Sequence, residues 1–354
     1  MIRLVAASIA LVATLASAAA APPPPVTVRM SVDEDPFVPV LAGELGCLKQ
    51  EGLEIVTVRI EDFAPNDYEF QAPMIAGKFD VAYHWFNHSL FGARHGVPVV
   101  SVMTINDAPG MKIMVARQQA GAIRTAADFS GKRVAEGAGY GTKALLNNYL
   151  ARKAGLPPKS YASVLTATAG REAAVRAGLI AGEVDVVTAQ EPMIGMLESA
   201  GLVSTLYDLN DRASTTKVLG AAWPAHSLLV APDFIRRNPQ TVQRLVNAFT
   251  CTMRFVNGAT AQQIADRLPA SYRKDMTRDA RVAWIAAQLP TFARGDYGIS
   301  PASVRLVADT IAGYGFDDSG SGKWRSTQRV VPRLKQLYDN RFVRKAMRRI
   351  PATR

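Results

Sequence analysis

A repeated segment is the feature that most constrains how this 354-residue chain can fold. Residues 75–82 read IAGKFDVA and residues 180–187 read IAGEVDVV, so five of the eight positions are identical. In each copy the pattern predicts a helix that ends at the glycine, followed by a buried strand that begins near Asp80 or Asp185. The repeat predicts two lobes of like topology that share this helix–turn–strand unit. The alternative is a chance likeness between two unrelated strand–helix units.

Strands and helices alternate along the chain, which is typical of the α/β class with a mostly parallel sheet. The strands expected in the first part of the chain are Val26–Val32, Leu53–Ile60, Phe79–Tyr83, Val97–Ile105 and Met111–Ala116. The segment Asn106–Gly110 is the first expected crossover between lobes. We therefore expect a first lobe made of residues 21–107 and 225–354, with the C-terminal helices in the latter, and a second lobe made of residues 108–224.

The N-terminal segment has the features of a secretory signal peptide. Arg3 gives it a charged start, Leu4–Leu15 is apolar, and the small residues of Ala16–Ala20 provide a cleavage site. Residues 1–20 are therefore excluded from the fold, and they predict export to the periplasm. The signal has no cysteine for a lipid anchor, and no later run reaches the ~18 apolar residues that a spanning helix needs.

Two cysteines in an exported chain are too few for a disulfide scaffold. Cys47 follows an expected helix and Cys251 lies inside another. The sequence does not give the distance between them, so pairing stays open, and we expect the two thiols to be unpaired.

The formal net charge is +11, and much of the excess lies at the C-terminal end. The cations there are Arg341, Arg344, Lys345, Arg348, Arg349 and Arg354, with no acid among them. A basic end can bind nucleic acid or an anionic membrane, but export excludes nucleic acid as a partner. We expect a solvated helix end, with attraction to a membrane surface as the alternative.

The stretch Gly131–Leu156 combines a short strand, a glycine-rich turn and a helix. The strand is expected over Arg133–Glu136 and the helix over Thr142–Lys153, with Gly137, Gly139 and Gly141 between them. Such a turn directs unpaired backbone N–H groups outward at a helix N-terminus, where they can hold an acceptor or an anion. The spacing matches neither the dinucleotide nor the P-loop glycine motif. It predicts either a ligand-gripping loop or an ordinary strand-to-helix turn.

Candidate ligand contacts follow the two repeats, because ligands of open α/β sheets bind beyond the carboxyl ends of the strands. In the first lobe they are Tyr83, His84, Trp85 and Asn87, and in the second lobe Gln190 and Glu191. The loop after the first strand adds Asp33, Asp35 and Phe37, and the glycine turn adds Gly139, Tyr140, Gly141 and Thr142. Trp223 lies near the expected return crossover and can close over a ligand.

Several of these residues also have a purely structural interpretation. Tyr83 and Trp85 can stack on a planar ligand or pack in the core, since strand residues alternate faces. His84 and His88 share the spacing of metal ligands, but only the Asp33–Asp35 loop offers a third ligand, so we expect a hydrogen-bonded pair and no metal. Glu191 can face the ligand or cap the next helix. Asp80 and Asp185 are expected to be turn residues and not a carboxylate pair.

The order of these segments resembles the periplasmic solute-binding proteins of the nitrate/sulfonate/taurine class of ABC importers. The matching segments are Pro36–Ile55, Ile75–Tyr83, Thr125–Leu156, Ile180–Pro192, Ala231–Phe249, Gly298–Ile311 and Leu337–Ala346, which run through nearly the whole mature chain. The resemblance implies a two-lobed (type II-like) periplasmic-binding-protein architecture with a ligand cleft between the lobes. It also implies a small-molecule solute, an ABC permease as partner and a monomeric protein.

Two departures from the pattern of that class bear on the solute. The turn Gly139-Tyr140-Gly141 replaces the small hydroxyl residues that suit sulfonate or nitrate oxygens, and Gln190 replaces a common aromatic residue. The carboxylates of Asp33, Glu34 and Asp35 repel an anion unless cations pair with them. We therefore expect a small polar solute that is planar or contains nitrogen.

No catalytic motif of the GxSxG, HExxH or CxxC type occurs in the sequence. We expect a binding protein with no catalytic residues and no cofactor. Two rival interpretations remain. The first is an enzyme like the pyrimidine-synthesising proteins of thiamine metabolism, which resemble this fold. The second is a sensory module that presents its ligand to a receptor.

Overall fold

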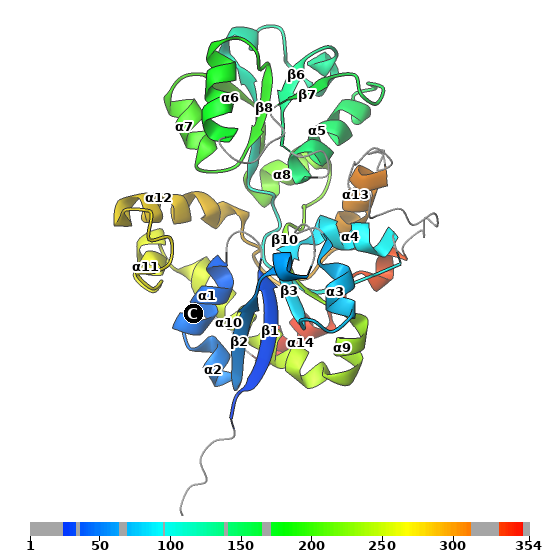
Figure 1. The fold of residues 1–354 in the computed structure, drawn as a ribbon, viewed down its shortest axis with the longest axis vertical. Helices are drawn as coiled ribbons and strands as arrows, with labels where there is room; N and C mark the ends of the chain where they lie inside the picture. The colour runs from blue at the N-terminus through cyan, green and yellow to red at the C-terminus, as the bar shows by residue number, and fades with distance from the viewer. Residues whose placement is uncertain are drawn as a thin grey trace, which may run out of the picture.

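The computed structural model describes residues 24–32, 36–63, 69–94, 96–137, 141–164, 171–312 and 333–349. These residues form two lobes, one above the other in Figure 1, each with a central sheet flanked by helices. The predicted signal peptide, residues 1–20, lies outside the described ranges. Within those ranges, no helix has the length and apolar character needed to cross a bilayer.

The sheet of the first lobe has five strands in the order β2-β1-β3-β10-β4. Their bounds are β1 (Val26–Val32), β2 (Leu53–Val58), β3 (Val81–Trp85), β4 (Val100–Thr104) and β10 (His226–Val230). β1 runs parallel to β2 and β3, whereas β10 runs antiparallel to both β3 and β4. β10 is therefore the one strand of the five that runs against the others.

The sheet of the second lobe repeats this arrangement in the order β7-β6-β8-β5-β9. Its strands are β5 (Met111–Ala116), β6 (Arg133–Ala135), β7 (Ala162–Val164), β8 (Val186–Ala189) and β9 (Val203–Leu209). β6 is parallel to β7 and β8, and β5 is antiparallel to β8 and β9. The predicted α/β class is confirmed, and the two sheets share one topology position by position, as the repeat predicted.

The aspartates of the repeat hold equivalent places in the two sheets. Arg29 of β1 donates from Nε and Nη2 to Asp80 at 3.2 and 2.8 Å, and its backbone N–H bonds the same carboxylate at 2.9 Å. Arg133 of β6 makes the same three bonds to Asp185, at 3.0, 2.9 and 2.9 Å. Burial opposes ionisation of Asp185, but the hydrogen bonds and charge of Arg133 outweigh it and lower the pKa of that carboxyl. Each aspartate thus ties the start of the strand that follows it, β3 or β8, to a neighbouring parallel strand.

Helices cover both sheets. In the first lobe they are α1 (Phe37–Glu44), α2 (Cys47–Gln50), α3 (Gln71–Ile75), α4 (Phe86–Arg94), α9 (Pro232–Arg237), α10 (Pro239–Gly258), α11 (Ala261–Ala265), α12 (Arg278–Gln288), α13 (Pro301–Ala312) and α14 (Arg341–Arg349). In the second lobe they are α5 (Thr142–Lys153), α6 (Arg171–Ile180), α7 (Met193–Ser199) and α8 (Arg212–Leu219). Short 3₁₀ turns lie at Ile60–Asp62, Arg117–Gln119, Ala126–Phe129, Leu289–Thr291 and Leu334–Gln336.

The long helix α10 organises the core of the first lobe. Its buried positions recur at the three- and four-residue spacing of an amphipathic helix and include Val242, Leu245, Val246, Phe249, Met253 and Val256. This stripe packs in one apolar cluster with residues of α1, α2 and α14. Each fully buried large apolar side chain contributes roughly 1.5–3 kcal/mol, so this stripe stabilises the lobe more than any single surface ion pair.

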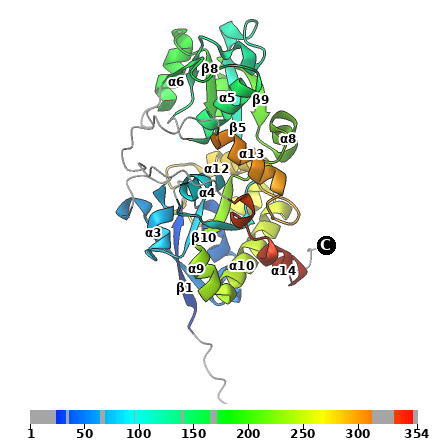
Figure 2. The same cartoon turned by 90° about the vertical axis from the view of Figure 1, so that its right-hand side faces the viewer.

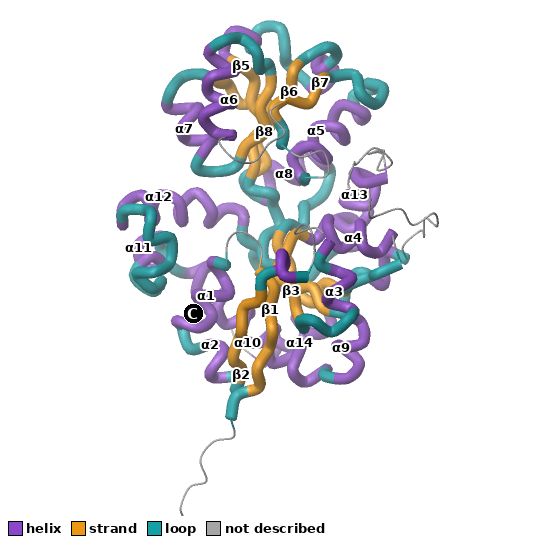
Figure 3. The backbone as a smooth tube through the Cα atoms, in the orientation of Figure 1, coloured by secondary structure: helices purple, strands orange, loops and turns teal. Residues whose placement is uncertain are grey.

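Two loops carry the chain between the lobes, and hydrogen bonds tie them together (Figure 3). Ile105 N donates to His226 O at 2.8 Å, and Ala225 N donates to Asn106 O at 2.8 Å. A third segment joins them, because Ala293 N donates to Ile105 O at 2.8 Å. β5 and β10 each begin directly after such a crossing. They therefore start at the edge of their sheet that faces the other lobe, where the parallel strands end. We call this the interlobe edge.

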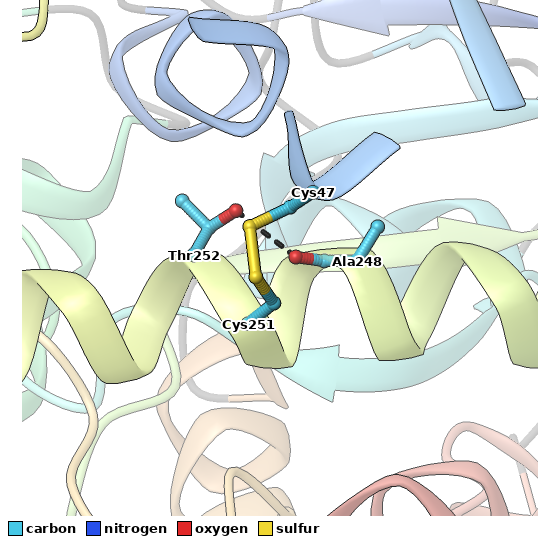
Figure 4. Close-up of a disulfide and its surroundings, with 4 residues drawn as sticks. All are labelled: Cys47, Ala248, Cys251 and Thr252. Carbon is cyan, nitrogen blue, oxygen red and sulfur yellow. Dashed lines mark hydrogen bonds between the residues drawn. A yellow bond between two sulfur atoms is a disulfide. The ribbon is translucent and has the colours of Figure 1, made fainter. Parts of the chain in front are cut away.

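The expectation that the two cysteines are unpaired is wrong. Cys47, the first residue of α2, is bonded to Cys251 in α10, with their Cα atoms 6.0 Å apart (Figure 4). The sequence positions differ by 204 residues, and only the packing of α2 against α10 brings the two thiols together. The bond joins the N-terminal part of the first lobe to the part that the chain forms after it has crossed back from the second lobe.

Replacement of both Cys47 and Cys251 by serine should lower the free energy of unfolding by about 2–5 kcal/mol. The reason is that the disulfide closes a very long loop in the unfolded chain, and its loss restores that conformational freedom. Urea unfolding followed by circular dichroism measures the change. A reductant should lower the midpoint of the wild type and leave that of the double variant unchanged. Equal midpoints for oxidised wild type and variant would contradict the assignment.

Candidate functional site

Three rings gather at the interlobe edge of the first lobe. His226 begins β10 opposite Trp85, the last residue of β3. The His226 ring stacks on Tyr83, with centroids 5.0 Å apart and planes 11° apart, and lies 4.9 Å from the centroid of Trp85. Tyr83 is buried, whereas Trp85 and His226 are half-exposed. The planes of Trp85 and His226 are tilted by 47°, so each half-exposed ring offers its own face on which a planar group can stack.

His84 points to the other face of β3, as strand alternation requires. It is fully buried, and its ring stacks on Phe70 with centroids 4.7 Å apart. Its Nδ1 accepts the backbone N–H of Trp85 at 2.9 Å and lies 3.2 Å from Nδ1 of His88. Since Nδ1 of His84 accepts, the proton between the two rings belongs to His88. The pair fixes the turn from β3 into α4, and the described residues contain no cluster of three or more metal-ligating side chains.

The N-termini of α4 and α5 meet across the two lobes. Thr142, the first residue of α5, donates from its hydroxyl to Oδ1 of Asn87 in the first turn of α4, at 3.3 Å. Both side chains are buried. Nδ2 of Asn87 has no hydrogen-bond partner among the described residues, although it is fully enclosed. A buried amide donor without an acceptor is unfavourable by about 1–3 kcal/mol, so a bound acceptor there would recover that energy. Helix α13 packs against both α4 and α5.

A buried polar network fixes α5 on the second sheet. Glu136 directly follows β6 and is almost fully buried. Its Oε2 accepts from Nδ2 of Asn147 at 2.8 Å and from the hydroxyl of Tyr161 at 3.2 Å, and Thr188 in β8 donates to Oδ1 of Asn147 at 2.9 Å. Burial raises the pKa of Glu136, and these hydrogen bonds only partly oppose it. The network links β6, β8 and α5, and so determines where Thr142 lies.

Sequence reasoning missed Glu136 and Arg171 as parts of the site. The sequence did contain a signal for Glu136, which is a charged residue at the end of a buried strand, immediately before the glycines. Arg171 begins α6 and is 9% exposed, and burial lowers the pKa of its guanidinium. It lies beside Gly137, where a Cβ would be 3.8 Å from its Cζ and where φ is +78°. That positive φ favours glycine, so the backbone turns directly beside a buried cation.

The residues after β8 are half-exposed at the interlobe edge of the second lobe. The backbone carbonyl of Gln190 accepts the backbone N–H of Ile194, and side-chain Oε2 of Glu191 accepts the backbone N–H of Gly195 at 3.0 Å. Glu191 therefore caps the first turn of α7 in this structure, which is the second of the two roles considered for it.

The remaining predicted residues fall into three groups. Phe37 and Trp223 lie in apolar cores; Phe37 stacks on Phe292 with centroids 5.5 Å apart, and Trp223 is fully buried in the crossing segment. Gly141, at the N-cap of α5, is half-buried. Asp33, Asp35, Gly139 and Tyr140 lie outside the described residues.

A buried ion pair lies at the crossing itself. Asp107 accepts from Nη1 of Arg212 in α8 at 3.0 Å, and its side chain is only 9% exposed. Its Oδ1 is enclosed with no hydrogen-bond partner in the described part of the chain. Burial raises the pKa of Asp107 to about 6, and the charge and hydrogen bond of Arg212 only partly offset this. Desolvation is thus the larger effect, as is common for buried pairs with one exposed partner.

A model of the family described as NMT1/THI5 like matches residues 37–256. The periplasmic aliphatic sulphonate binding protein of Escherichia coli matches with a TM-score of 0.63 at 18% identity, over 81% of this chain and 91% of that one. The periplasmic nitrate-binding protein of Synechocystis matches with a TM-score of 0.62 at 12% identity, over 93% and 90%.

An enzyme shares the fold as well. A desulfurization enzyme matches with a TM-score of 0.58 at 15% identity, over 92% of this chain and 99% of that one. No curated protein matches this chain in sequence. The structural likenesses confirm the two-lobed fold, and the family match supports the resemblance that the sequence predicted.

The replacement Asp107→Asn should remove a dependence of stability on pH. A carboxyl whose pKa is about 6 when folded and 3.8 when unfolded stabilises the fold below pH 3.8, and this contribution is lost as pH rises towards 6. The wild type should therefore lose about 2 kcal/mol of unfolding free energy relative to the variant between about pH 4.5 and about pH 7.5. Urea unfolding at about pH 4.5 and about pH 7.5 measures the difference.

The matched control is Asp279→Asn, an exposed aspartate in α12. It should leave the pH profile of the wild type unchanged. The opposite result would be a variant that is destabilised more at the higher pH than at the lower one. Arg212 would then stabilise the ionised carboxylate of Asp107 by more than burial destabilises it, and the account of this pair would be wrong.

Proposed function

Because this chain belongs to the NMT1/THI5-like family, we propose that it is an extracytoplasmic solute-binding protein that captures a small polar solute for an ABC-type importer. The observation that carries the proposal is the meeting of two like sheets at their interlobe edges. Polar and aromatic side chains from both lobes gather there, and an enclosed amide of Asn87 has an unused donor. Solved binding proteins for sulphonate and nitrate have the same fold.

Export to the periplasm is part of the proposal. It is supported by the signal-like N-terminal segment and by the disulfide between Cys47 and Cys251, since such bonds persist in oxidising compartments. A permease in the inner membrane is the proposed partner, and the protein acts as a monomer.

The proposed mechanism is hinge closure. Among the described residues, the two lobes are linked by the crossing segments, which the bonds of Ile105, Asn106 and Ala225 hold, by the contacts of α13 with α5, and by the bond of Thr142 to Asn87. A solute that touches both lobes favours the closed form by its difference in affinity for the two forms. The proposed contacts of the first lobe are Tyr83, Trp85, Asn87 and His226. Those of the second lobe are Gly141, Thr142, Gln190 and Arg171.

The chemistry of these contacts favours a planar polar solute with an oxygen or nitrogen acceptor. Trp85 and His226 provide the stacking surface, and Nδ2 of Asn87 provides the donor. In this proposal His84 and Glu136 position their neighbours, while Phe37 and Trp223 support the two edges from the core. Arg171 adds a cation, so an oxyanion such as those named for the solved relatives is the competing solute class.

An enzyme is the second candidate, because a desulfurization enzyme shares the fold over nearly its whole length. We place it second because the solved sulphonate- and nitrate-binding proteins match this chain with higher TM-scores, 0.63 and 0.62, than the desulfurization enzyme, 0.58. Conversion of the bound compound, rather than its release unchanged, would favour the enzyme.

Trp85→Ala should weaken solute binding by about tenfold, since loss of one stacked aromatic ring removes roughly 1–1.5 kcal/mol. Isothermal titration with the identified solute measures the affinity. The matched control is Tyr338→Ala, a half-buried ring that lies beside Ser101 near the start of β4, away from the interlobe edge. This control should keep its affinity. An unchanged affinity of Trp85→Ala would place Trp85 outside the site.

The proposed function is tested by mass spectrometry of compounds that co-purify with the protein from periplasmic extract, followed by a thermal-shift panel. We expect a small polar compound that is released unchanged and that raises the melting temperature when added back. Strong stabilisation by sulfonates or nitrate, with none by amines or heteroaromatic compounds, would overturn the proposed solute class. Absence of any stabilising solute in the panel and in the extract would overturn the binding function.

A further inference from the structure

A groove lies between α10 and α14 on the first lobe, with a volume of about 680 Å³. Figures 1 and 2 show α14 in the lower lobe, away from the upper lobe and from the interlobe edge. The side chains that line it include four arginines, one lysine, three amides and no carboxylate: Pro239, Gln240, Gln243, Arg244, Asn247, Arg341, Phe342, Lys345, Arg348 and Arg349. Its size is that of a site for a small organic group.

The charge of the groove comes mainly from one face of α14. This helix buries Phe342, Val343 and Ala346 and exposes its cations. Arg341 pairs with Asp339 at 2.8 Å, and Arg349 pairs with Glu51 at 3.2 Å. The remaining three, Arg344, Lys345 and Arg348, have no carboxylate within ion-pair distance in the described ranges of the chain.

These cations repel one another, because side chains three and four residues apart are neighbours on a helix. Arg348 and Arg349 lie in the last turn, where the helix dipole favours positive charge. Arg344 and Lys345 have no such compensation. An anion bound along this face would remove the repulsion.

The groove is formed before any ligand arrives. Arg244 in α10 donates to the backbone carbonyl groups of Glu51 and Gly52, the latter at 2.6 Å. Gln243 donates to the carbonyl of Phe342 at 3.0 Å, which fixes α14 against α10. Binding therefore requires little rearrangement, and a preformed site loses less entropy on binding.

We propose that this α10–α14 groove binds the phosphate headgroups of anionic phospholipids and so holds the protein at a membrane surface. Arginine and lysine recognise phosphate oxygens by charge-assisted hydrogen bonds. A single free anion would be held best by buried cations that converge on one point. Here the cations are exposed and spread along a helix, with Arg344 outside the groove, and Phe342 and Pro239 supply an apolar floor. That arrangement matches many headgroups in a plane.

The test is co-sedimentation of the mature protein with vesicles of phosphatidylcholine alone and with vesicles that contain equal amounts of phosphatidylcholine and phosphatidylglycerol. The protein should bind the anionic vesicles and not the neutral ones, and salt should weaken the binding. Lys345→Gln/Arg348→Gln should reduce the partition constant by about 30-fold, from roughly 1 kcal/mol for each cation near an anionic surface.

The matched control is Arg176→Gln/Lys217→Gln, which removes the same charge from exposed positions on the second lobe. It should change the partition constant less than twofold. Both double variants should keep the melting temperature and solute affinity of the wild type, which separates this proposal from the proposed function.

Three results would overturn the proposal. The first is equal binding of wild type to neutral and anionic vesicles, or to neither. The second is an equal loss of binding in both double variants, which would assign the effect to net charge. The third is release from vesicles by inorganic phosphate at a concentration where sodium chloride of equal ionic strength has no effect, which would assign the groove to a free anion.

Discussion

The hydrogen bonds between residues 105–107 and residues 223–226 determine where the two sheets of this protein meet. They hold the outgoing and returning segments side by side, with residues 291–293 as a third layer. Because β5 and β10 start at this crossing, each enters its sheet from the opposite lobe and runs antiparallel to its neighbours. The carboxyl ends of the parallel strands in both lobes then lie next to the crossing. Helices α4 and α5 begin there, which brings Asn87 and Thr142 together.

The same constraint explains the distribution of buried charge. At the starts of β3 and β8, Arg29–Asp80 and Arg133–Asp185 satisfy each carboxylate with three hydrogen bonds. At the interlobe edge and the crossing, Glu136 and Asp107 are buried with raised pKa values. Polar groups that are incompletely satisfied are unfavourable for stability, and proteins retain them where a ligand or a movement uses them. The two ends of each sheet thus differ. The end away from the other lobe has satisfied, structural charges, and the interlobe edge has buried charges that are suited to binding.

The pattern of the sequence predicted the fold well, because hydrophobic periodicity and the repeat depend on local spacing. The segments Val26–Val32, Met111–Ala116 and Thr142–Lys153 have the predicted bounds. What depends on tertiary distance was not predicted: the pairing of Cys47 with Cys251, and the burial of Glu136 and Arg171. At the site, His84 was expected beside Trp85 as a ligand contact, but strand alternation directs it into the core, where it stacks on Phe70. The ring that lies next to Trp85, His226, comes from a strand far along the chain.

The most direct test of the account is a crystal structure of the protein purified with its native solute. The account predicts electron density for the solute at the interlobe edges, in contact with Trp85 or His226 of the first lobe and with Thr142 or Gln190 of the second. Density that touches only one lobe, or that lies away from these edges, would contradict it.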